Sequence, residues 1–147
     1  MSYESAASLR TALEARLRHQ SDASGISLDR LRRRVVFERV VARLELAEPG
    51  RWVLKGGMAL EVRLRDRARL TKDLDLGVRD VVDDAEDLYE RLVEALDTDP
   101  LGDRFILSAP PLTPLSEDGG GFLTWRTTVA ARLAGTVFGW IKLDLSP

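Results

Sequence analysis

The sequence contains no cysteine and a single histidine, His19. The missing cysteine excludes disulfide bonds, cysteine-ligated zinc, iron–sulfur clusters and thiol nucleophiles. One histidine excludes multi-histidine metal sites and disfavours histidine-based acid–base chemistry. No apolar run approaches the roughly 18–20 residues of a membrane span, and the N-terminus lacks the apolar core of a signal peptide. Any chemistry must therefore rest on carboxylates, arginine, lysine and hydroxyl groups, in a protein that we expect to be cytoplasmic and not bound to membranes.

What is present is a charged but balanced composition, with 22 Lys and Arg against 24 Asp and Glu, and 44% apolar residues. A chain of 147 residues with this composition is long enough to bury one core. We therefore expect one domain over residues 1–147, divided into N-terminal helices (1–48) and a core (51–147). Cations are in excess in residues 1–79 and acids in residues 80–147. This asymmetry fits a compositional background better than a half that faces a polyanion.

Hydrophobic periodicity predicts a mixture of helices and strands. The predicted helices cover residues 8–18, 28–44 with Ser27 as N-cap, a segment after Gly56-Gly57, and 81–97. The predicted strands cover residues 51–55, 70–78, 105–107, 122–133 and 137–145, with a mobile loop at 110–121 and a hairpin turn at 134–136. This order predicts an α+β fold, a mixed sheet flanked by helices with two helices at the N-terminus.

Two features of the pattern have competing interpretations. The helix over residues 28–44 carries six arginines on one side, either as a solvated face or as a contact for phosphate groups. The three tryptophans, Trp52, Trp125 and Trp140, are interpreted as structural, although a base could stack on one of them.

Three segments bring together groups suited to phosphate chemistry. Gly56-Gly57 lies between a strand and a helix start, where backbone N–H groups can approach an anion. Asp73 and Asp75 are two apart on a predicted strand, so both carboxylates face the same side. Asp144 lies on the polar side of the last strand, and a third carboxylate there would complete a site for two divalent ions.

Other interpretations of the acidic pair fit less well. An EF-hand loop that began at Asp73 would need glycine at its sixth position, where the sequence has Val78. A glycosyltransferase with an Asp-x-Asp motif needs a larger nucleotide-sugar domain than this chain can hold. The remaining alternative is that Asp73 and Asp75 are solvent-exposed acids on a half-buried strand and have no catalytic or binding role.

The segments Val53-Leu54-Lys55-Gly56-Gly57-Met58-Ala59-Leu60 and Arg69-Leu70-Thr71-Lys72-Asp73-Leu74-Asp75-Leu76 together resemble the AbiEii/AbiGii-type nucleotidyltransferase toxins. The segment Ile141-Lys142-Leu143-Asp144 is similar to the part of that family that carries its third aspartate. The resemblance implies the DNA polymerase β-like nucleotidyltransferase fold. It also implies a toxin of a toxin–antitoxin or phage-defence system that transfers a nucleotide from an NTP to an RNA acceptor, such as a tRNA 3′ end.

Residue by residue, the resemblance implies that Asp73, Asp75 and Asp144 are the catalytic and Mg²⁺-binding carboxylates. It implies that the nucleotide phosphates are bound by Lys55, Gly56, Gly57, Arg69, Thr71 and Lys72. Thr71 is also a candidate for inhibitory modification. A cognate antitoxin protein is the implied partner.

Two departures from the family pattern keep alternatives open. Met58 stands where the family often has a hydroxyl residue, so only backbone donors remain there. Members of the family are usually longer, with a C-terminal helical region that we expect to be absent from this sequence. The alternatives are transfer of AMP to a protein hydroxyl, or a truncated module that binds nucleotide, RNA or antitoxin without turnover.

Overall fold

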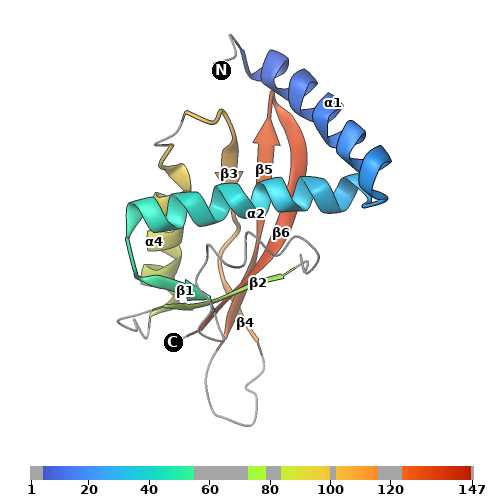
Figure 1. Ribbon diagram of the computed structural model, residues 1–147. Helices are drawn as coiled ribbons and strands as arrows, with labels where there is room; N and C mark the ends of the chain where they lie inside the picture. Colours follow the sequence, from blue (N-terminus) through green and yellow to red (C-terminus); the bar gives the residue numbers. More distant parts are fainter. Residues whose placement is uncertain (1–4, 55–72, 79–83, 100–101, 116–123, 147) are drawn as a thin grey trace.

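The computed structural model describes residues 5–54, 73–78, 84–99, 102–115 and 124–146, and for Leu54 and Asp73 the backbone alone. Within these ranges the chain forms three helices and a curled, six-stranded mixed sheet (Figure 1). The predicted α+β class, with two N-terminal helices, is confirmed. The helix predicted after Gly56-Gly57 lies outside the described residues.

The three helices begin at polar caps that the sequence supplies. Helix α1 (Ala6–Ser24) has Ser5 as its N-cap and Gly25, with a φ of 75°, as its C-cap. Helix α2 (Leu28–Ala47) begins at the predicted cap, Ser27, whose hydroxyl accepts a bond from the Arg30 N–H. Helix α4 (Ala85–Asp97) begins after Asp84. The prediction for α1 was too short, because the polar run before Gly25 continues the helix until the left-handed glycine ends it.

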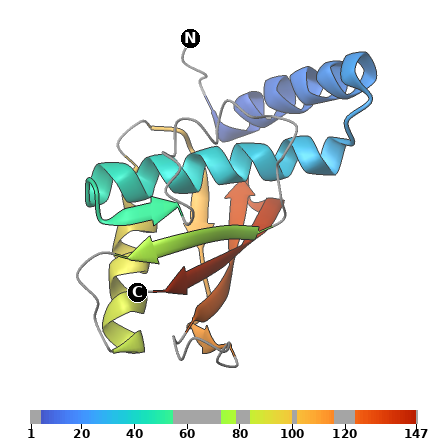
Figure 2. The same ribbon diagram turned by 60° about the horizontal axis from the view of Figure 1, so that its bottom comes forward.

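The strands form one sheet in the order β1-β2-β6-β5-β3, with β4 paired to β5. Their bounds are β1 Trp52–Leu54, β2 Asp73–Val78, β3 Ile106–Ser108, β4 Thr113–Pro114, β5 Trp125–Leu133 and β6 Thr136–Ser146. Only β2 and β6 are parallel among these pairs; the others are antiparallel. Figure 2 shows β2 and β6 side by side below α2.

Several other element predictions also differ from the structure in their bounds, and three of these differences have a local cause. The strand expected over residues 105–107 is shifted by one residue, because Phe105 is already held by a bond from its N–H to the Asp103 carboxylate. The helix expected over 81–97 begins at Ala85, since Asp84 caps it. The loop expected over 110–121 contains the short strand β4, which pairs with Trp125 and Arg126.

The predicted hairpin between β5 and β6 is confirmed. Ala134 and Gly135 form its two-residue turn, with φ of 54° and 84°. Positive φ at both turn positions matches the twist of the flanking strands. The hairpin places residues 125–133 against residues 136–146 and so sets which side chains of the two strands share a face.

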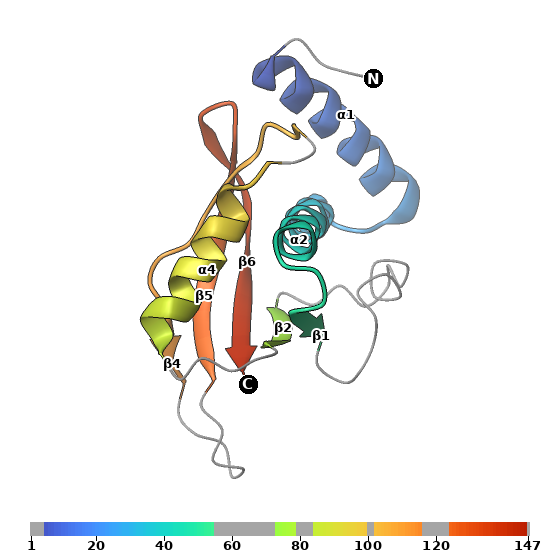
Figure 3. The same cartoon turned by 90° about the vertical axis from the view of Figure 1, so that its left-hand side faces the viewer.

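One face of the sheet packs on the helices, and the other carries the polar residues. Alternate strand residues enter the core against α2 and α4: Leu74, Leu76, Leu107, Val129, Ile141, Leu143 and Leu145. Helix α2 lies beside β6 (Figure 3) and contributes Val36, Val40 and Leu44 to the same core. Because strand side chains alternate, Asp75, Arg126, Lys142 and Asp144 lie on the opposite face, which we call the polar face.

Four of the six arginines of α2 pair within the chain, so they form neither an unpaired solvated face nor a surface left for phosphates. Arg43 is buried and donates bonds to the carbonyls of Leu96 and Phe105 and to the carboxylate of Asp103. Arg32 pairs with Glu14 and Asp29, Arg34 with Glu38, and Arg39 with Asp103. This basic helix therefore holds the fold together on the side opposite the polar face.

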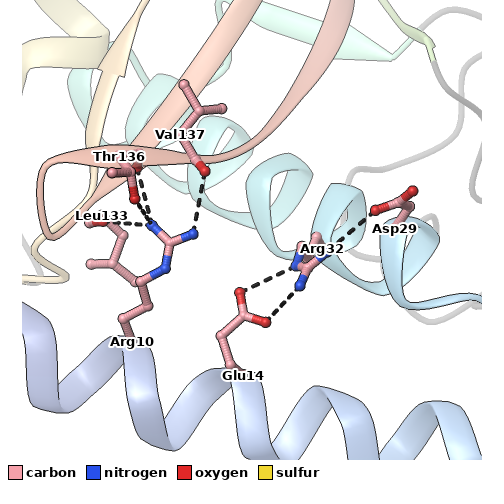
Figure 4. Close-up of polar contacts among 7 residues, drawn as sticks. All are labelled: Arg10, Glu14, Asp29, Arg32, Leu133, Thr136 and Val137. Carbon is pink, nitrogen blue, oxygen red and sulfur yellow. Dashed lines mark hydrogen bonds and ion pairs between the residues drawn. The ribbon is translucent and has the colours of Figure 1, made fainter.

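Helix α1 is attached by two polar contacts, drawn in Figure 4. Arg10 donates bonds to the carbonyl oxygens of Leu133, Thr136 and Val137 at the hairpin tip. Glu14 forms a two-bond pair with Arg32 of α2, at 2.7 and 3.2 Å. The hydrogen bonds from Arg32 lower the pKa of Glu14 below its ordinary value.

Trp52 is fully buried and Trp125 packs against the core, as their structural interpretation predicts, whereas Trp140 is exposed and its role stays a prediction. Trp140 lies opposite Ala130 in the β5–β6 ladder, and 45% of its surface is exposed. Alanine is too small to cover an indole ring. The indole therefore lies on the polar face, two residues before Lys142 on β6.

Candidate active site

The backbone register brings the two strands that carry the predicted aspartates together. Asp75 of β2 and Asp144 of β6 are direct partners in the parallel pair. Asp73 is the partner of Lys142 in the same pair, two residues before Asp75. Neighbouring strands in register present the same face, so Asp75 and Asp144 share the polar face at adjacent positions.

Asp144 is held by a residue that the sequence reasoning missed, Arg126 of β5. Its Nε lies 2.7 Å from Oδ1 of Asp144 and its Nη2 lies 2.9 Å from Oδ2. Arg126 and Asp144 are also partners in the antiparallel ladder. The polar face thus carries Arg126, Asp144 and Asp75 in one row across β5, β6 and β2.

The exposure of the three side chains differs along this row. Asp75 is exposed, whereas the Asp144 side chain is 13% exposed and that of Arg126 is 36% exposed. A carboxylate that is mostly removed from water needs hydrogen bonds or an opposite charge. Arg126 supplies both for Asp144, and Asp75 relies on solvent or on a bound cation.

The only sequence signal for Arg126 is its place on the polar side of an alternating strand, and many surface arginines share that property. Its pairing depends on the hairpin register, which the length of the turn determines. The residue was therefore identifiable only once the strands were aligned.

The phosphate-binding candidates lie outside the described residues. These are Lys55, Gly56, Gly57, Arg69, Thr71 and Lys72. The backbone on either side of them is described. Strand β1 ends at Leu54, whose partner is Leu76, the residue after Asp75.

The donor set on the polar face is suited to a hard divalent cation. Mg²⁺ binds carboxylate oxygens, often one or two together with substrate phosphates. Asp75 and Asp144 provide two such groups at adjacent positions. Among the side chains that the structure describes, no three His, Cys, Asp or Glu residues gather as a metal site; Asp73, the third carboxylate of the expected set, is not among those side chains.

Comparison with known families identifies the chain. The sequence profile of the family described as "Nucleotidyl transferase AbiEii toxin, Type IV TA system" matches residues 39–147, well over half of the sequence. The chain belongs to the AbiEii nucleotidyltransferase toxin family. The predicted resemblance is thereby confirmed. A search of curated proteins found no match.

Membership of the AbiEii family establishes the coarse function. The protein is an enzyme, a nucleotidyltransferase toxin of a type IV toxin–antitoxin (TA) system, for which a nucleotide substrate and a cognate antitoxin follow. The matched range begins within α2 and includes all the described strands, and so includes Asp75, Arg126 and Asp144. Helix α1 lies outside it. Within the described part of the chain, no helix has both the length and the apolar character needed to cross a membrane.

Proposed function

We propose that this AbiEii-family chain is a Mg²⁺-dependent enzyme that transfers a nucleotide from an NTP to an RNA hydroxyl, such as that of a tRNA 3′ end. The observation that supports a divalent ion is the register of Asp75 with Asp144 on adjacent strands. Two carboxylates at neighbouring positions repel each other unless a cation lies between them. An NTP brings further oxygen ligands on its phosphates.

In the proposed reaction the acceptor hydroxyl oxygen attacks the α-phosphorus of the NTP. A new P–O bond forms, the bond to the β-phosphate oxygen breaks, and pyrophosphate leaves. Divalent ions, when bound, neutralise charge on the triphosphate and favour ionisation of the hydroxyl. Asp144 either accepts the proton of that hydroxyl or holds the ion next to it, and Asp73 and Asp75 complete the carboxylate set.

The chain's other contribution is to position the substrates. The proposed ligands of the triphosphate are Lys55, Gly56, Gly57, Arg69, Thr71 and Lys72. Cationic and backbone N–H donors suit this role because the phosphates keep negative charge throughout the transfer.

The polar face favours RNA over protein as the acceptor. Trp140 is exposed on this face, four residues before Asp144 on the same strand, which corresponds to about 13 Å at about 3.3 Å per residue. Lys142 lies between them and Arg132 is exposed on β5. An exposed aromatic ring next to cations suits a single-stranded end, whose bases stack and whose phosphates need positive charge.

The test is a transfer assay with each α-labelled NTP, Mg²⁺, total RNA and lysate protein. We expect the wild-type chain to label a nuclease-sensitive product and Asp75→Asn to label none. Asp22→Asn, an exposed aspartate of α1, is the matched control and should behave as wild type. Transfer by Asp75→Asn at the wild-type rate would overturn the proposal.

The two alternatives give different results in the same assay. Protease-sensitive label would indicate transfer of AMP to protein. Nucleotide binding that depends on Mg²⁺ without any transfer would indicate a binding module. Both proposed substrates, the NTP and the RNA acceptor, are found in the cytoplasm. We therefore propose that the enzyme acts in the cytoplasm and binds its antitoxin there.

A further inference from the structure

Arg126 holds Asp144 more firmly than strand pairing requires. The two strands already pair along the whole of β5, so the ladder does not depend on this ion pair. The two bonds of 2.7 and 2.9 Å engage both oxygens of the carboxylate. A planar guanidinium that binds both oxygens fixes the rotation of the carboxylate as well as its position.

The ion pair between Arg126 and Asp144 also adds a positive charge beside the two carboxylates of the polar face. Asp144 lies between Arg126 on β5 and Asp75 on β2. Each carboxylate oxygen has two acceptor positions, so two bonds to Arg126 leave one position free on each oxygen. The carboxylate therefore stays able to bind a cation, but next to a permanent positive charge.

We infer that Arg126 is a positioning residue of the proposed metal site: it fixes the orientation of the Asp144 carboxylate on the polar face and weakens the binding of a divalent ion there. This inference rests on the proposed function. The weaker binding follows because a guanidinium repels the ion. The orientation follows because the carboxylate is held before the ion arrives, so less ordering remains for substrate binding.

The two effects of Arg126 have opposite signs, which makes them separable. Arg126→Met removes the charge and keeps an unbranched side chain, so a divalent ion should bind more tightly. The same change frees Asp144 to rotate, so nucleotide transfer should become slower. A residue with only a structural role would weaken both properties when replaced.

The experiment measures Mn²⁺ binding to the full chain without nucleotide, by titration with electron paramagnetic resonance detection. We expect Arg126→Met to lower the Kd for Mn²⁺ by roughly tenfold, and to slow transfer by at least about tenfold. Arg126→Lys keeps the charge, so its Kd should stay within about twofold of wild type. Arg18→Met, an exposed arginine of α1, is the matched control and should leave the Kd unchanged.

The outcomes separate this inference from the proposed function. An unchanged or higher Kd in Arg126→Met would overturn the role of Arg126, even if the metal site is real. If the wild type binds no Mn²⁺, or if Asp75→Asn and Asp144→Asn leave its binding unchanged, the metal site is wrong and the inference falls with it. Circular dichroism checks folding, and Arg126→Gln replaces Arg126→Met if the latter does not fold.

Discussion

Asp75 and Asp144 are 69 positions apart in the numbering and direct partners in the parallel pair of β2 and β6. No local pattern brings them together, because the segments between them include α4 and the β5–β6 hairpin. Their pairing places two carboxylates at adjacent positions on the polar face. This relationship is the basis of the proposed active site.

Asp75→Asn and Asp144→Asn should affect stability differently while both abolish transfer. Asp75 is exposed, so its replacement should change the free energy of unfolding by less than about 0.5 kcal/mol. Asp144→Asn weakens two charge-assisted bonds to Arg126 and should cost about 1–3 kcal/mol. Urea denaturation measures both values. Equal stability loss in the two variants would contradict the described pairing.

Trp140→Ala should weaken use of the RNA acceptor without loss of stability, because the indole is exposed on the polar face. Loss of one stacked base costs about 1–3 kcal/mol, which corresponds to a rise in the RNA KM of roughly 5- to 150-fold. The KM for NTP should not change. Val137→Ala, another exposed apolar residue of β6, is the control. A normal RNA KM in Trp140→Ala would argue against stacking at this position.

Arg43→Met should destabilise the fold strongly. Arg43 is 3% exposed and joins α2 to the end of α4 and the start of β3. Its removal leaves two buried carbonyls and the Asp103 carboxylate without this donor, at a cost of about 3–5 kcal/mol. Arg30→Met, at an exposed position of the same helix, should change stability by less than about 0.5 kcal/mol. Chemical denaturation of the two variants tests this, and similar midpoints would contradict it.

Acid should weaken the attachment of α1 through Glu14. Hydrogen bonds from Arg32 lower the folded-state pKa of Glu14 below its ordinary 4.5. The carboxylate is therefore ionised more readily in the folded state, and its contribution to stability is complete above the unfolded pKa. That contribution is lost as the pH falls through the folded pKa.

The pH measurement compares the wild type with Glu14→Gln. Between about pH 6 and about pH 3, the wild type should lose up to about 1 kcal/mol more than the variant. Glu90→Gln, an exposed carboxylate of α4, provides the reference for general acid effects. Parallel stability curves for wild type and Glu14→Gln would show that the pair with Arg32 does not contribute.

Elements with a strong local signal were predictable from the sequence, and their ends were less so. Ser27 capped α2 as expected, because a serine before an apolar periodic segment satisfies free N–H groups at the helix start. The end of α1 was missed, since a polar run does not stop a helix until Gly25 adopts a positive φ. Strand β4 was missed because Thr113 and Pro114 pair only through contact with β5.

Local sequence was enough to establish the family, the alternation that separates Leu74 and Leu76 from Asp75, and the hairpin at Ala134-Gly135. These depend on neighbouring residues and on the period of the strand. The folded arrangement of the strands and helices was needed to show that Arg43 is buried, that Trp140 is exposed, and that Arg126 binds Asp144 in the strand next to Asp75. These properties depend on which strands become neighbours and in what register, and no local pattern contains that information.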